Sequence, residues 1–288
     1  MLRPVWPPGC GLLVVGHGTA DAVGAAETRA TAGLAAALLP GVPVGIGFLE
    51  IASPSIGTAV TRLAGRGCRT IVAAPLLLFA AGHARRDVPE ALVAAAAQAG
   101  VGVLQSAPFG CHERIVELSA RRRREAVERL APVDAADTVL VMIGRGSSAP
   151  DAVPQLREFA QLSVAASGTP PAGVELAFVA AARPTLDEAL AAAADRAAVP
   201  RRVVVQPHLL FHGHVQEQVT AAVDRWRAAR PEIEWVQVER LGADRAVAAA
   251  LVDRAGEAAR PETRQGSSGE AEKHAPDASR QASGKSPQ

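Results

Sequence analysis

Two histidines and one glutamate occupy positions at which α/β proteins often place their reactive side chains. His17, Glu50 and His83 each follow an apolar run that is predicted to be a strand, and His17 stands between two glycines. Open parallel sheets bind ligands at the carboxyl ends of their strands, and glycines let a ligand approach the backbone closely. Two imidazoles and a carboxylate suit a divalent first-row metal, and a neutral imidazole can also accept a proton.

Each of these residues also has an ordinary interpretation. A histidine after a strand often caps or packs, Glu50 could cap a helix or form a salt bridge, and GHGT could be a tight turn that leads into a helix. The motif lacks the third glycine and the lysine of a phosphate-binding loop, so that interpretation is weak.

The composition excludes several chemistries. Among the 288 residues, 49% are hydrophobic, 20% are charged, the formal net charge is +1, and there is no tyrosine. Lysines occur at positions 273 and 285 and nowhere earlier, so the body of the chain has no Schiff-base or phosphate-loop lysine. With so small a net charge, we expect no nucleic-acid or membrane partner.

The cysteines and the apolar runs indicate a compartment. Cys10, Cys68 and Cys111 form no C-x-x-C pair, which favours a reducing environment. The proline-rich N-terminus does not resemble a signal peptide, and the longest apolar run, 71–81, is too short to span a bilayer. We therefore expect a cytoplasmic protein.

Apolar runs alternate with stretches of helical spacing along the chain. Near-continuous apolar strands joined through helices are typical of a parallel sheet that is covered by helices on both faces, which predicts an α/β fold. In the first half, the predicted strands are 11–15, 42–49, 70–79 and 101–107, and the predicted helices are 25–39, 55–64, 88–99 and 112–130.

Three sequence blocks of the first half recur in the same order in the second. TVLVMI with GRGSS repeats LLVV with GHGT, FVAAARP repeats FLEIASP, and VVVQPHLLFHG repeats IVAAPLLLFAAG. The repeat predicts two similar domains from an internal duplication, at 11–132 and 137–258, with a ligand site in the cleft between them. Residues 260–288 contain almost nothing apolar and are predicted to be a disordered tail.

The two copies differ at the reactive positions. Arg145 stands where the first copy has His17, and Ala180 stands where it has Glu50. We therefore expect one active centre, on the N-terminal domain, with the second domain supplying walls and cations.

The segments LLVVGHGTAD, GFLEIASPSI and APLLLFAAGHARRDVPEAL resemble, in order and spacing, the sirohydrochlorin chelatase family of class II tetrapyrrole chelatases. The resemblance covers roughly residues 11–255, and the second half is similar to the C-terminal half of the long, two-domain members. It implies insertion of Co²⁺ or Fe²⁺ into sirohydrochlorin without ATP, in cobalamin or sirohaem biosynthesis. It also implies a metal that is a co-substrate, no permanently bound cofactor, and a complete site in a monomer.

The same resemblance implies residue roles. His17 matches the catalytic histidine that binds the metal and accepts a pyrrole proton, His83 matches the second metal ligand, and Glu50 matches an acidic residue that contacts metal or macrocycle. The stretch that matches the substrate-contacting loop consists of Leu78, Phe79, Ala80, Ala81 and Gly82.

Arginines near the cleft suit a substrate with eight carboxylates, because the guanidinium fork binds carboxylates well. Arg85, Arg86 and Arg145 are the candidates, with ordinary surface charge as the alternative, while the run 121–124 is expected to be a solvated helix face.

The second copy has histidines of its own, and a different class of function remains open. His208, His212 and His214 lie on the copy of the His83 strand and loop, with His214 at the position of His83. They could make an auxiliary metal or substrate contact, or simply line a degenerate site. The alternative function is a binding protein that holds a metal or tetrapyrrole on this scaffold without inserting one.

Overall fold

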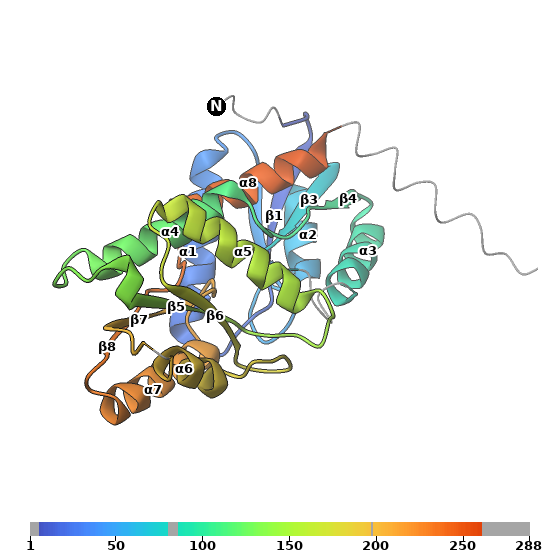
Figure 1. Ribbon diagram of the computed structural model, residues 1–288. Coiled ribbons are helices and arrows are strands. Elements are labelled where there is room, and N and C mark those ends of the chain that lie inside the picture. Colours follow the sequence, from blue (N-terminus) through green and yellow to red (C-terminus); the bar gives the residue numbers. More distant parts are fainter. Residues whose placement is uncertain (1–5, 80–85, 197, 261–288) are drawn as a thin grey trace, which may run out of the picture.

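A computed structural model describes residues 6–79, 86–196 and 198–260, and it contains two parallel four-stranded sheets (Figure 1). The strand orders are β2-β1-β3-β4 and β6-β5-β7-β8, so the second sheet repeats the topology of the first. This confirms the predicted duplicated α/β fold. The strands are β1 (Cys10–Gly16), β2 (Val44–Phe48), β3 (Thr70–Pro75), β4 (Gly102–Gln105), β5 (Thr138–Gly144), β6 (Gly173–Phe178), β7 (Arg202–Pro207) and β8 (Glu234–Gln237).

Helices cover both faces of each sheet, which is why the central strands are apolar throughout. All seven residues of β1 are buried, and every residue of β7 is buried too. The helices are α1 (Ala22–Leu38), α2 (Ile56–Gly65), α3 (Asp87–Ala99), α4 (Glu113–Val127), α5 (Ala152–Ser167), α6 (Leu186–Ala194), α7 (His214–Ala229) and α8 (Arg245–Ala259).

Side-chain caps begin the helices that follow the first two strands. Asp21 accepts a hydrogen bond from the backbone N–H of Gly24 at 2.6 Å and so caps α1. Ser55 caps α2, and at the equivalent point of the second copy Thr185 forms a capping box with Glu188. Such caps satisfy N–H groups that the first helical turn leaves without a partner.

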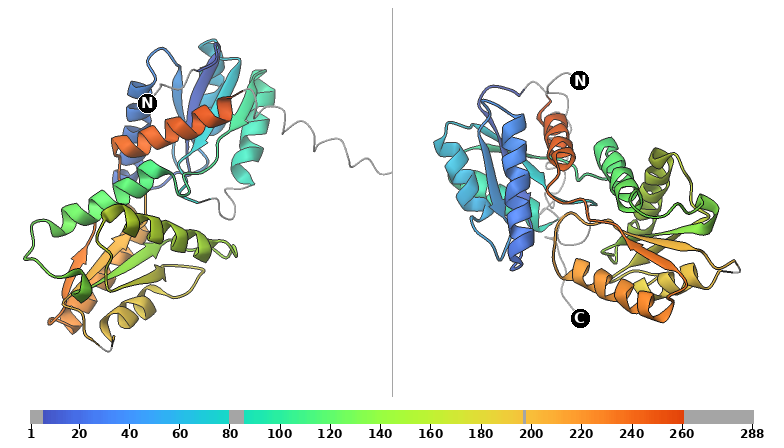
Figure 2. Two further views of the ribbon diagram at one scale, coloured as in Figure 1. Left: turned by 45° about the horizontal axis from the view of Figure 1, so that its top comes forward. Right: turned by 90° about the vertical axis from the view of Figure 1, so that its left-hand side faces the viewer.

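The last helix of each repeat packs on the sheet of the other repeat (Figure 2). Helix α8 lies against α1 and β3, and α4 lies against α5 and approaches β8. One apolar core therefore runs from one sheet to the other through these four helices. The boundaries 11–132 and 137–258 describe the repeat along the sequence and stay a prediction.

The arginine run of α4 is only in part the solvated face that its charge predicts, since Arg121 and Arg124 are exposed while Arg122 and Arg123 are partly buried. Arg121 and Arg122 both contact the carboxylate of Asp244, at 2.5 and 3.3 Å. Arg123 reaches inward and donates a hydrogen bond to Gln206 of β7 at 2.7 Å. Burial lowers the pKa of Arg123 to about 10, so the side chain stays charged at neutral pH. Through these ion pairs and hydrogen bonds, arginines of the first repeat bind side chains of the second repeat.

Within the described residues, no helix has both the length and the apolar character needed to cross a membrane. The predicted disordered tail falls almost wholly on residues 261–288, which lie outside the described part of the chain.

Candidate functional site

The ends of the adjacent strands β1 and β2 bring His17 and Glu50 together. Nε2 of His17 lies 2.9 Å from Oε1 of Glu50, and the backbone N–H of Glu50 donates to the carbonyl of His17 at 3.0 Å. The two side chains are 53% and 54% exposed, so both remain open to ligands from solvent. An imidazole paired with a carboxylate is held in one orientation and can act as a ligand or accept a proton.

Only glycine fits beside this pair. Gly18 has φ +103°, and a Cβ there would lie 1.8 Å from the carbonyl oxygen of Glu50. Gly146 repeats the arrangement in the second copy, where a Cβ would lie 1.8 Å from the carbonyl oxygen of Ala180. The second glycine of GHG and of GRG therefore lets the two strand-end loops touch.

The residue after Glu50 has an unusual backbone conformation. Ile51 has φ 63° and is 69% exposed, and Ala181, its counterpart in the second copy, has φ 54°. A positive φ is unfavourable for a β-branched residue, and such strain is typical of functional loops. The positive φ of Ile51 sets the direction in which the backbone continues after Glu50.

The third strand end is described only up to Phe79. Strand β3 pairs with β1, so the chain leaves it beside the His17 loop. His83, with Ala80, Ala81, Gly82 and Arg85, lies outside the described residues, so its expected place beside His17 stays a prediction. Leu78 is half-buried and Arg86 is exposed.

Phe79 is half-buried and contacts rings of the second domain. Its ring centroid lies 5.2 Å from that of His208 and 6.5 Å from that of Phe159. His208 is 3% exposed, and burial lowers its pKa to about 3, so the ring is neutral. Neither ring nitrogen has a hydrogen-bond partner within the described chain. A cavity of about 300 Å³ borders Phe79, and Cys111 and Glu158 of α5 also line it.

Arg145 follows β5 as His17 follows β1. The backbone N–H of Ala180 donates to the carbonyl of Arg145 at 2.9 Å, as Glu50 does to His17. Arg145 is exposed. The second copy thus keeps the loop geometry and has a permanent cation where the first has an imidazole.

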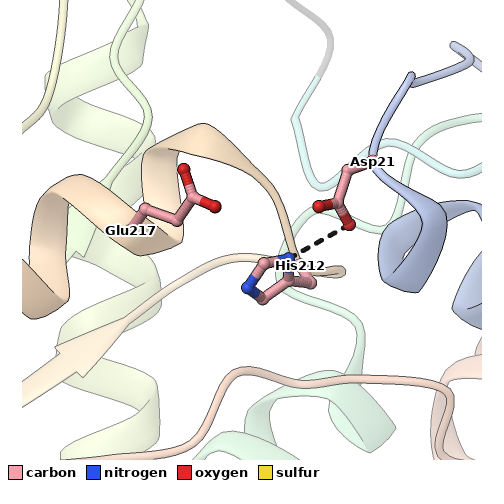
Figure 3. A group of neighbouring side chains, drawn as sticks. All are labelled: Asp21, His212 and Glu217. Carbon is pink, nitrogen blue, oxygen red and sulfur yellow. Dashed lines mark hydrogen bonds and ion pairs between the residues drawn. The ribbon is translucent and has the colours of Figure 1, made fainter.

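The three histidines of the second copy have different environments. His208 is buried, and His214 is largely exposed on the first turn of α7. His212 crosses to the first domain, where its Nδ1 lies 3.0 Å from Oδ1 of Asp21 (Figure 3). The sequence reasoning did not single out Asp21, although its place after GHGTA marks it as a helix cap.

Comparisons with known proteins agree with this architecture. The CbiX family model matches residues 11–126 and again residues 139–258. A sirohydrochlorin ferrochelatase of Priestia megaterium is 33% identical over 180 residues, which are 62% of this chain and 64% of the relative. A sirohydrochlorin cobaltochelatase of the same organism is 28% identical over 189 residues, which are 65% and 60% of the two chains. These two matches thus span less than two thirds of either relative.

A solved structure extends the likeness to nearly the whole fold. SirB from Bacillus subtilis with Fe³⁺ superposes with a TM-score of 0.76 at 26% identity, covering 89% of this chain and 98% of that one. The family match occurs twice, and it coincides with both sheets and with the paired strand-end loops. This chain therefore belongs to the CbiX family, the family of the sirohydrochlorin chelatases.

Proposed function

We propose that this protein inserts Co²⁺ or Fe²⁺ into sirohydrochlorin without ATP. The observation that carries the proposal is the half-exposed His17–Glu50 pair at the ends of β1 and β2, in a chain of the CbiX family. The metal is a substrate and leaves in the product, so weak and exchangeable ligands suit the task better than a closed cage. A named ferrochelatase and a named cobaltochelatase are both among the relatives, so both metals stay in the proposal.

Insertion exchanges two pyrrole protons for one metal ion. His17 binds the incoming ion through imidazole, and as the ion passes to the macrocycle the freed ring takes up one pyrrole proton while the second proton passes to solvent water. Glu50, 2.9 Å away, orients the ring and stabilises the imidazolium that forms. His83 is the second metal ligand in this proposal, because its loop continues from β3 beside β1.

The second domain binds the macrocycle. Arg145 cannot replace His17, since a guanidinium has no lone pair for a metal or a proton, but it can bind a substrate carboxylate. Leu78 and Phe79 begin the stretch, continuing through Gly82, that contacts the macrocycle in this proposal, and Phe79 packs against rings of the second domain. Both halves are in one chain, so we propose that the monomer is active.

The decisive experiment mixes purified protein with sirohydrochlorin and either Co²⁺ or Fe²⁺, without ATP, and follows the absorption spectrum of the macrocycle. We expect turnover above the spontaneous rate, and its loss in His17→Ala. His214→Ala is the matched control, because this exposed histidine lies in the other domain and should leave the rate unchanged. Binding with no gain over the spontaneous rate would instead establish a tetrapyrrole-binding protein.

A further inference from the structure

A second group of metal-ligating side chains lies between the two domains. Asp21 comes from the first turn region of α1, and His212 and Glu217 come from the loop after β7 and the start of α7 (Figure 3). One donor atom from each residue lies within 4.8 Å of the others. The group shares no residue with the His17–Glu50 pair.

Two of the three ligands are already held in position. Asp21 accepts hydrogen bonds from Gly24 N–H and forms the 3.0 Å contact with His212 Nδ1. The backbone N–H of His212 donates to Glu27 at 2.7 Å, and Glu27 is itself paired with Arg240. The His212 backbone is thus bonded directly to the first domain, which gives the site the rigidity that metal ligands need.

The charge of the group favours a cation. Within the described residues, the ion pairs of Asp21 and Glu217 are with histidines alone, whereas nearby Glu27 is neutralised by an arginine. Two carboxylates beside one imidazole leave negative charge that a divalent ion would compensate.

The spacing also fits one ion. Two ligands that bind the same first-row ion at about 2.1 Å lie about 3 Å apart, which is the separation of His212 Nδ1 and Asp21 Oδ1. The Glu217 carboxylate points toward the other two in Figure 3, and its side chain is 59% exposed, so a rotamer change can bring it into contact. A mixed set of imidazole and carboxylates suits Co²⁺, Fe²⁺ or Zn²⁺ better than Mg²⁺.

We propose that Asp21, His212 and Glu217 bind a second divalent first-row cation, which bridges the two domains and is separate from the substrate metal at His17. Without the ion, the ring N–H of His212 donates to Asp21. With the ion, the deprotonated ring nitrogen and the carboxylates bind the metal instead. Asp21 starts α1 directly after the His17 loop, so the ion fixes this loop against the loop after β7.

Co²⁺ alone is the probe, because it needs no tetrapyrrole and reports its ligands in the visible spectrum. Equilibrium dialysis of the full chain would count the bound ions for the wild type and for His17→Ala, His212→Ala and Glu217→Gln. Asp224→Asn is the matched control, since this exposed carboxylate lies on the same helix as Glu217, pairs with Arg227 and is outside the group. Circular dichroism would check that each variant is folded.

We expect two ions for the wild type and for Asp224→Asn, and one each for His17→Ala and His212→Ala. Glu217→Gln should weaken the second site by at least about tenfold. Co²⁺ should also raise the melting temperature of His17→Ala but not that of the His17→Ala/His212→Ala double variant. If His212→Ala binds as many ions as the wild type, the proposal is wrong. One ion that is lost in His212→Ala and kept in His17→Ala would support this site and argue against the proposed metal role of His17.

Discussion

Two pairs of equivalent residues distinguish the halves of this molecule. The loops at His17–Glu50 and Arg145–Ala180 share their backbone hydrogen bond and their close-packed glycine, but they differ in the side chains that can exchange protons or bind metal. The backbone geometry is therefore a property of the scaffold, and the chemistry depends on which side chain stands at the strand end.

This difference predicts opposite kinetic effects for two substitutions. His17→Ala should reduce kcat to near the spontaneous rate, because ligand and base are lost together. Arg145→Ala should raise KM for sirohydrochlorin by about tenfold to a hundredfold with little change in kcat, since one charge-assisted contact contributes about 1.5–3 kcal/mol. Steady-state kinetics with metal in excess would measure both, and equal losses of kcat would refute a binding role for Arg145.

At the scale of elements, the loop after β3 meets the second domain through a cluster of three rings. His208 contacts both Phe79 and Phe159, with ring centroids 5.2 and 3.9 Å away, and the two phenylalanine rings meet edge to face. Because the imidazole is fully enclosed and lacks hydrogen-bond partners in the described chain, it acts as an aromatic ring that is costly to charge. These ring contacts hold Phe79, the last residue described after β3, against the second domain.

The buried ring predicts a pH-dependent stability. Its pKa is about 3 in the folded protein and about 6.5 when unfolded, so the unfolded chain binds the extra proton as pH falls below 6.5. This contribution to stability is present above pH 6.5 and is lost as the pH falls toward 3, at up to about 1.4 kcal/mol per unit.

His208→Phe should remove this component and make the protein more resistant to acid. Denaturant unfolding between pH 7 and pH 4.5 would measure the difference, with exposed His214→Phe as the control. An unchanged pH dependence in His208→Phe would show that other groups cause the acid sensitivity.

At the scale of the whole molecule, the exchanged helices make the two sheets depend on each other. The buried residues of α8 pack into the core that reaches the first sheet, although α8 is the last element of the second repeat. Neither repeat, cut at its sequence boundary, would keep all the helices that cover its sheet.

Two truncations test this arrangement. A chain ending after Ala259 should keep its melting temperature and its activity, because residues beyond it have almost no apolar side chains to bury. A chain ending after Asp244 lacks α8 and should lose the cooperative unfolding of the first domain, since residues such as Leu251 leave the core. Scanning calorimetry would compare the melting temperatures of the two shortened chains with that of the full chain. A chain ending after Asp244 that melts at the same temperature as the full chain would show that α8 does not stabilise the first domain.

Hydrophobic runs, glycine positions and repeated blocks were enough to predict the α/β class, the duplication and the positions of His17 and Glu50 after strands. These features follow from local periodicity and from the rule that parallel strands end at one edge, so a single sequence carries them. The sequence placed His17 and Glu50 after strands, and the structure then showed that β1 and β2 are adjacent, which brings the two side chains together.

Only the tertiary structure decided what lies between the domains. Asp21 and His212 are 191 residues apart, and Arg123 bonds to a residue 83 positions away, so no local pattern links them. The charge of residues 121–124 predicts a solvated helix face, and only the docked second repeat shows that Arg122 and Arg123 are partly buried. The sequence of a helix likewise does not show which of the two sheets it covers. Which side chains are buried at the interface, and which partners they contact, depends on how the two complete domains dock. The same docking brings Asp21, His212 and Glu217 together.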